Sequence, residues 1–202
     1  MSILPLDIHK HDLDRVTNLI YETDRGLFEL LFGKQKNNAL QKIKALITQE
    51  ENSFSYHYIT VAVINQEIQG ILIGYTGEDI NSKKQSDEMW TALGLTSALR
   101  LAFIDKMLLQ SVLTTHLSAQ DFYISNLCVH KEARGKGIGT SLLQHAKTIA
   151  EKKGCSFMYL DVSEENKKAT QLYKSLGFTI KTTKTVRFFK QSITIHSMKL
   201  EM

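Results

Sequence analysis

The chain has 202 residues, of which 43% are hydrophobic and 23% charged, and its formal net charge is +4. This is the composition of a soluble domain, and no apolar run approaches the roughly 18 residues that a membrane span needs, so we expect no membrane partner. The mild basicity fits an anionic ligand but is too weak to predict nucleic-acid binding. Scattered histidines predict no metal site. An early charged segment without a signal-peptide core, together with only two cysteines, predicts a cytoplasmic protein with reduced thiols.

Hydrophobic periodicity assigns the first part of the chain to helices and strands. Apolar residues spaced by three or four predict helices, and β-branched runs predict strands. The expected elements, in chain order, are a strand over residues 3–8, a helix that Asp12 caps, helical structure over about 25–50 with a break at Gly33, and hairpin strands over 58–64 and 67–75. The chain therefore opens as a strand, helices and an antiparallel hairpin.

A polar loop and a strongly apolar segment follow the hairpin, over about residues 77–119. Gly94 is expected to divide the apolar segment into two helices, and the apolar residues of the longer helix cover more than half of its circumference. So wide a stripe fits a homodimer interface through about residues 87–114, a hydrophobic substrate wall, or a helix buried in its own domain. We interpret the segment as a helical insertion in a single domain that spans residues 1–202.

Strands and helices alternate in the rest of the chain. The expected elements are a strand over residues 121–129, a helix over 137–153, a strand over 156–162, a helix over 166–176 and two final strands. Strand-helix-strand units imply parallel pairing, whereas hairpins imply antiparallel pairing. We therefore predict an α/β fold with a mixed sheet.

Residues 134–140, with the sequence RGKGIGT, connect a strand to a helix. A glycine turn that leads into a helix presents unpaired backbone N–H groups, which favour a phosphate, and Arg134 and Lys136 add charged donors. The spacing does not fit the nucleotide P-loop. It also departs from the dinucleotide fingerprint, because Thr140 replaces its third glycine, although Asp161 follows at about the right distance. We therefore interpret the turn as an anion site, and the plainer alternative is a turn that only lets a strand meet a helix.

Two segments of the chain, in order, resemble the GNAT superfamily of acyl-CoA-dependent N-acyltransferases. RGKGIG resembles its Arg/Gln-x-x-Gly-x-Gly/Ala signature, and ENKKATQLYKSLGF resembles its N-x-x-A-x-x-L-Y-x-x-x-G-F helix. The matching positions are Arg134, Gly137 and Gly139, then Asn166, Ala169, Leu172, Tyr173, Gly177 and Phe178. The resemblance covers most of the chain except roughly residues 76–120. It implies a mostly antiparallel sheet of about seven strands, helices on both faces, and a splay between the fourth and fifth strands.

The resemblance implies that acetyl-CoA is the cosubstrate and enters the splay. The glycine turn would hold the pyrophosphate, the preceding strand would offer main-chain groups to the pantetheine arm, and Asn166 would bond to that arm or to backbone beside it. The implied CoA-binding residues are Leu127, Val129, Arg134, Gly135, Lys136, Gly137, Ile138, Gly139, Thr140, Asn166 and Tyr173. Asn166 and Tyr173 also share a helix face and lie about 10 Å apart along its axis, which suits an elongated ligand.

The resemblance further implies that Tyr173 is the general acid, although a buried structural tyrosine is the plainer alternative. A tyrosine, with a reference pKa of about 10, is protonated at working pH and therefore has a proton to donate to the leaving thiolate. Direct attack by the amine in a ternary complex needs no cysteine nucleophile. We expect Cys128 to face away from Leu127 and Val129 and to serve packing.

The general base is the least determined part of the predicted site. Some family members place a glutamate on the fourth strand where this chain has Tyr123. The nearest carboxylate that should lie on the same side of the strand as Tyr123 is that of Asp121, two residues earlier. Asp121 is therefore our candidate catalytic base. Glu78, Asp79, His130 and an ordered water chain are the alternatives.

These features predict transfer of an acetyl group from acetyl-CoA to a primary amine on a small molecule, a peptide or a protein. The acceptor itself stays open, because function lies in the site and not in the fold. Since the cofactor motifs are intact while no base is evident, the alternative is a non-catalytic acyl-CoA-binding sensor. Nucleic-acid binding through the basic final strands is the weakest candidate, because few aromatic residues accompany the charges.

Overall fold

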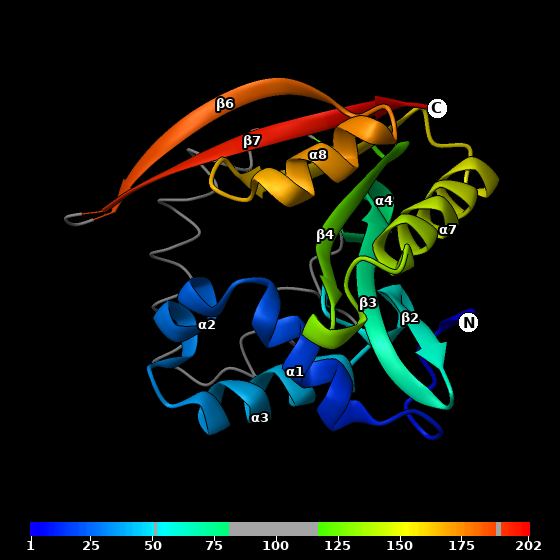
Figure 1. Ribbon diagram of the computed structural model, residues 1–202, viewed down its shortest axis with the longest axis vertical. Helices are drawn as coiled ribbons and strands as arrows, with labels where there is room; N and C mark the ends of the chain where they lie inside the picture. The colour runs from blue at the N-terminus through cyan, green and yellow to red at the C-terminus, as the bar shows by residue number, and fades with distance from the viewer. Residues whose placement is uncertain (51, 81–116, 189–190) are drawn as a thin grey trace.

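The computed structural model describes residues 1–50, 52–80, 117–188 and 191–202 (Figure 1). Its helices and strands are β1 (Ser2–Pro5), α1 (Leu13–Thr23), α2 (Arg25–Phe32), α3 (Lys36–Ile47), β2 (Ile59–Ile64), β3 (Glu67–Thr76), α4 (Gly77–Ile80), β4 (Asp121–Val129), α7 (Ile138–Lys152), β5 (Phe157–Ser163), α8 (Lys167–Ser175), β6 (Thr179–Phe188) and β7 (Gln191–Glu201). Apart from its two ends, the predicted insertion at 77–119 lies outside the described residues, and so does the predicted dimer surface at 87–114.

The strands form one seven-stranded sheet in the order β1-β2-β3-β4-β5-β7-β6. Neighbouring strands are antiparallel except β4 and β5, which run parallel. β4 and β5 pair over only four residues each, from Asp121 to Ile124 and from Phe157 to Leu160, and then separate. From Asn126 onward the recorded partners of β4 lie on β3. The predicted mixed sheet and its splay are confirmed.

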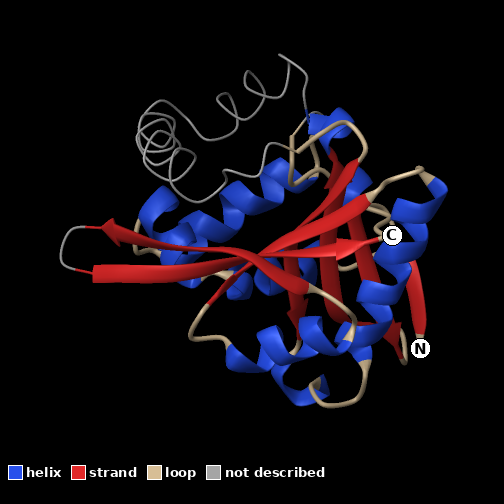
Figure 2. Ribbon diagram, turned by 90° about the horizontal axis from the view of Figure 1, so that it is seen from above, coloured by secondary structure: helices blue, strands red, loops and turns tan. Residues whose placement is uncertain are grey.

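Helices cover both faces of the sheet, as predicted (Figures 1 and 2). The α1-side core, which includes Val16, Phe28, Ile43, Ile71 and Ile73, fills the space between the sheet and the helices α1 to α3. The α7-side core, which includes Leu72, Phe122, Leu142, Leu160 and Tyr173, lies on the opposite face with α7 and α8. Consecutive β3 residues alternate between the two cores, as side chains of a strand must. Among the described residues, the helices are too short or too polar to cross a membrane.

Local sequence signals set most element ends. The Asp12 carboxylate accepts the backbone N–H groups of Asp14 at 2.9 Å and Arg15 at 3.1 Å, which confirms the predicted cap of α1. Gly33 ends α2 and separates it from α3. The first strand is shorter than the predicted 3–8, because it ends at Pro5 and the Asp7 carbonyl then accepts the N–H of His11 at 2.9 Å in a turn.

Candidate functional site

The glycine turn between β4 and α7 has open space around it. Gly135 and Gly137 have φ values of +77° and +79°, a conformation that only glycine adopts without strain. A Cβ atom at either position would meet no heavy atom within 4 Å. Gly139 differs, because its Cβ would lie 3.3 Å from Cδ2 of Leu172 on α8. The first two glycines therefore shape the turn, whereas the third lets α7 and α8 approach.

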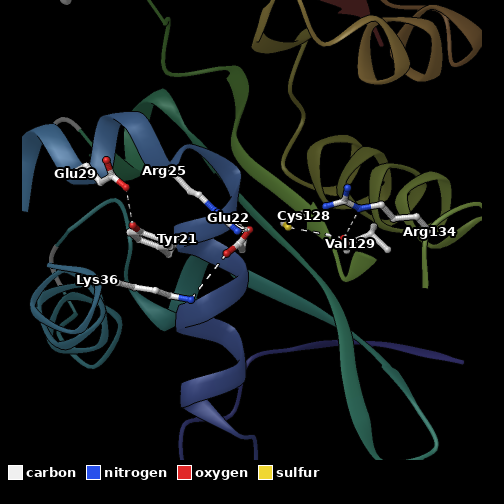
Figure 3. Close-up of polar contacts among 8 residues, drawn as sticks. All are labelled: Tyr21, Glu22, Arg25, Glu29, Lys36, Cys128, Val129 and Arg134. Carbon is white, nitrogen blue, oxygen red and sulfur yellow. Dashed lines mark hydrogen bonds and ion pairs between the residues drawn. The ribbon is translucent and has the colours of Figure 1, made fainter. Parts of the chain in front are cut away.

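The turn also carries donors for an anion. Gly137 is the N-cap of α7, and no side chain of the described residues caps that end of the helix. The first backbone N–H groups of α7 are therefore available to a ligand. Arg134 donates from Nε to the Val129 carbonyl at 2.9 Å, which holds its guanidinium at the end of β4 (Figure 3). Lys136 is exposed on the same turn. This arrangement fits a phosphate-bearing ligand.

The last residues of β4 divide between the two faces of the sheet. Leu127 and Val129 pack against the α7-side core, whereas Cys128 is buried in the α1-side core. This confirms that Cys128 faces away from its two neighbours. Burial raises the pKa of the Cys128 thiol, and a raised pKa disfavours the nucleophilic thiolate. Cys128 is a packing residue.

A β-bulge marks the point where β4 leaves β5. The register between β3 and β4 passes from Ile73 opposite Asn126 to Gly74 opposite Ile124, so Ser125 is an extra residue. The Ser125 hydroxyl contacts Oδ1 of Asn126 at 2.8 Å, and Nδ2 of Asn126 donates to the Thr23 hydroxyl at 2.8 Å. The bulge is thereby tied to the end of α1.

Asn166 and Tyr173 lie on α8 as predicted. Asn166 is the N-cap of this helix, and its Oδ1 accepts the N–H of Ala169 at 3.2 Å. Tyr173 is buried in the α7-side core, where its ring meets Phe178 edge-on with centroids 5.9 Å apart. Burial raises the pKa of Tyr173 to about 12. Within the described residues its hydroxyl forms no hydrogen bond, so a protonated donor is available to a ligand.

The predicted base, Asp121, is the first residue of β4 and lies at the opposite end of the strand from the glycine turn. Its Oδ2 accepts the backbone N–H of Ser118 at 2.8 Å, and the Ser118 carbonyl accepts the N–H of Asp121 in return. Asp79 is paired with Lys153 at 2.7 Å. Both carboxylates therefore already have partners within the protein.

Asp161 is the residue that the sequence reasoning missed. It follows Leu160, the last β5 residue paired with β4, so it stands where the splay begins. Leu160 and Val162 pack in the α7-side core, and Asp161 therefore projects to the opposite face. Its Oδ2 accepts the Tyr123 hydroxyl at 2.9 Å, whereas its Oδ1 is buried without a partner among the described residues. A lone carboxylate in the apolar strand FMYLDV was the signal that could have revealed it.

The pKa of Asp161 is raised, chiefly because burial disfavours its charged form. The hydrogen bond from Tyr123, the neighbouring Ser197 of β7 and the charge of Lys184 lower it in part. Glu22 on α1 is a carboxylate in a different environment, because it contacts two cations (Figure 3). Its partners are Nε of Arg25 at 3.0 Å and Nζ of Lys36 at 4.0 Å. Asp161 thus combines a raised pKa with a bare oxygen, which suits a proton acceptor. In the described part of the chain, His, Cys, Asp and Glu side chains form no cluster of three that could hold a metal ion.

Comparisons with known proteins agree with this geometry. Residues 25–178 match the model of the acetyltransferase (GNAT) family. A thialysine N-epsilon-acetyltransferase of Sus scrofa is 40% identical over 60 residues, which cover 30% of this chain and 35% of that protein. An uncharacterised N-acetyltransferase of Methanocaldococcus jannaschii is 28% identical over 172 residues, or 85% of this chain and 58% of that protein. The match thus spans about a third of the thialysine enzyme's length.

A solved structure is similar along nearly the whole chain. The N-acetyltransferase from Staphylococcus aureus Mu50 superposes with a TM-score of 0.72 at 20% identity, covering 99% of this chain and 100% of that one. At this identity the likeness shows the fold alone.

Proposed function

The chain belongs to the acetyltransferase (GNAT) family, and from this we propose that it transfers an acetyl group from acetyl-CoA to a primary amine. The observation that carries the proposal is the splay of β4 and β5, with the open glycine turn at one end and Tyr173 and Asp161 on its two faces. An elongated thioester fits between two strands that have separated, whereas a compact ligand would leave most of that edge unused.

The residues of the splay fit CoA. We propose that backbone N–H groups from Lys136 to Thr140 bind the pyrophosphate, because the Gly137 site is open and the first turn of α7 has no side-chain cap. Arg134 and Lys136 add positive charge there. The β4 edge from Leu127 to Val129, no longer paired with β5, would bond to the pantetheine amides. Asn166 would contribute its exposed amide, since its Oδ1 already caps α8.

Two side chains would handle the protons. We assign the general base to Asp161, in preference to Asp121, because Asp161 has a bare buried oxygen at the splay. As the amine nitrogen bonds to the acyl carbon and the C–S bond breaks, Asp161 would take a proton from the amine. Tyr173, which its raised pKa keeps protonated, would give its proton to the departing thiolate. Cys128 takes no part.

The acceptor and the cellular location are inferred from a relative's name and from the cysteines. The name of the Sus scrofa relative refers to the ε-amine of thialysine, so amino-acid side-chain amines are the first acceptors to test, followed by peptides. The described cysteines, Cys128 and Cys155, are both free and buried, which supports a reducing, cytoplasmic location. The homodimer through residues 87–114 stays a prediction.

The test is acetyl-CoA binding by calorimetry together with thiol release against a panel of amines. We expect the wild-type protein to bind acetyl-CoA and to release CoA with at least one amine. Asp161→Asn and Tyr173→Phe should bind acetyl-CoA normally but turn over at least about 100-fold more slowly, whereas Asp121→Asn should stay active. Binding without turnover on any amine would support the sensor alternative, and absence of binding would refute the proposed function.

A further inference from the structure

Resting on the proposed function, we propose that Tyr123 is a positioning residue for the reaction: its hydroxyl holds one oxygen of Asp161 and leaves the other for the acceptor amine. Tyr123 lies on β4 and Asp161 on β5, so the contact bridges the two strands immediately before they separate. The base would then be held by a pair of side chains, one from each strand of the splay.

Contacts among three tyrosine rings restrict the direction of the Tyr123 hydroxyl. Tyr123 stands opposite Tyr159 in the β4–β5 register, two residues before Asp161 on β5. Its ring packs on Tyr75 of β3 with centroids 5.8 Å apart, and Tyr75 packs on Tyr58 at the same separation. A ring packed in this way cannot easily turn, so the hydroxyl stays at 2.9 Å from Oδ2 of Asp161. The packing of the sheet therefore holds this hydrogen bond in place.

The two oxygens of Asp161 have different roles. Oδ2 accepts the Tyr123 hydroxyl, whereas Oδ1 is buried and without a partner in the part of the chain that the structure describes. Buried polar atoms are nearly always hydrogen-bonded, so this oxygen has room for a further donor, and we assign that donor to the acceptor amine. A primary amine supplies such a donor through its N–H. Without Tyr123, either oxygen could turn toward the sheet and the distinction would be lost.

The groups that face Asp161 predict how the pH dependence of kcat/KM changes when the Tyr123 hydroxyl is removed. They are Tyr123 from β4, Tyr75 from β3, Lys184 from β6 and Ser197 from β7. Burial raises the pKa of Asp161, and the Tyr123 hydrogen bond lowers it. Tyr123 itself has a pKa well above its ordinary value, so it remains a donor. Because the base acts in its ionised form, loss of this hydroxyl should move the acidic limb of kcat/KM to higher pH.

The experiment compares Tyr123→Phe with Tyr75→Phe, a matched loss of one hydroxyl on the neighbouring ring, whose hydroxyl bonds to Ser125. We measure kcat/KM against pH, the Kd of acetyl-CoA, and the Asp161 pKa by carbon-13 NMR of labelled aspartate, identified by its absence in Asp161→Asn. In Tyr123→Phe, the NMR pKa and the acidic limb should both rise by about one unit, a tenfold loss of kcat/KM below the limb. Acetyl-CoA affinity should be unchanged, and Tyr75→Phe should follow the wild type.

Each outcome separates this inference from the proposed function. If the wild type is active and Asp161→Asn is not, but Tyr123→Phe keeps the wild-type pH profile and NMR pKa, the positioning role is refuted and the function stands. In the Asp161→Asn background, Tyr123→Phe should cause no further loss, and an additive loss would also refute the role. A wild type that binds acetyl-CoA without turnover on any amine would overturn both.

Discussion

Replacing Gly137 with alanine separates the stability of the glycine turn from its proposed role in binding. Gly137 has a φ of +79°, and no heavy atom lies within 4 Å of the place that an alanine methyl group would take. The substitution therefore costs backbone strain of about 1 kcal/mol and creates no clash within the protein. For a chain of this size that is a fall in Tm of about 2–4 °C. If the CoA pyrophosphate occupies the open space, the added methyl should also weaken acetyl-CoA binding at least about tenfold, or 1.4 kcal/mol.

Gly154, at the other end of α7, is the matched control. It has a φ of +68° and equally open surroundings, so Gly154→Ala should cost a similar amount of stability. Its distance from Gly137 is about 25 Å along the helix axis, and acetyl-CoA affinity should be unaffected. Urea unfolding and calorimetric titration of both variants provide the test. Equal affinities for the two variants would refute the assignment of the turn as the pyrophosphate site.

Three further predictions concern the splay. Asp161→Asn should stabilise the fold more at neutral pH than below the ordinary aspartate pKa of about 4. The reason is that a raised pKa makes the wild type lose stability as the pH rises from the ordinary value through the raised one. An equal effect in urea unfolding at both pH values would contradict this. Tyr173→Phe should leave Tm within about 2 °C of the wild type, because its hydroxyl has no partner among the described residues; a large fall would favour a structural tyrosine. Asn166→Ala should cost about 1 kcal/mol in urea unfolding through loss of the α8 cap, and should also weaken acetyl-CoA binding; unchanged affinity would remove Asn166 from the CoA site.

Much of the fold could be predicted from local patterns. The bounds of β4, residues 121–129, agree with the prediction, because an apolar run ends there at a basic glycine turn. The cap at Asp12, the break at Gly33 and the hairpin are equally local signals. β1 ends early because proline and a turn follow, which periodicity alone does not weigh. The splay was predicted from the family resemblance, since pairing between distant strands leaves no local signature.

The base that we propose, Asp161, could not be found by counting along β4. Strand parity places Tyr123 and Val129 on one face, but the extra residue Ser125 reverses the alternation. Tyr123 consequently packs with the α1-side core and Val129 with the α7-side core. Asp161 was noted in the sequence only as a failed match to a dinucleotide motif, because its contact with Tyr123 depends on the register between β4 and β5.

The most direct test of the acyl-CoA site is a crystal structure of the protein with CoA. The pantetheine should lie beside Leu127 to Val129 in the gap between β4 and β5, with the pyrophosphate on the first turn of α7. The CoA sulfur should lie within about 3.5 Å of the Tyr173 hydroxyl, on the opposite side of the splay from Asp161. CoA bound elsewhere, or with its sulfur beyond reach of Tyr173, would contradict the assignment of this splay as the catalytic site.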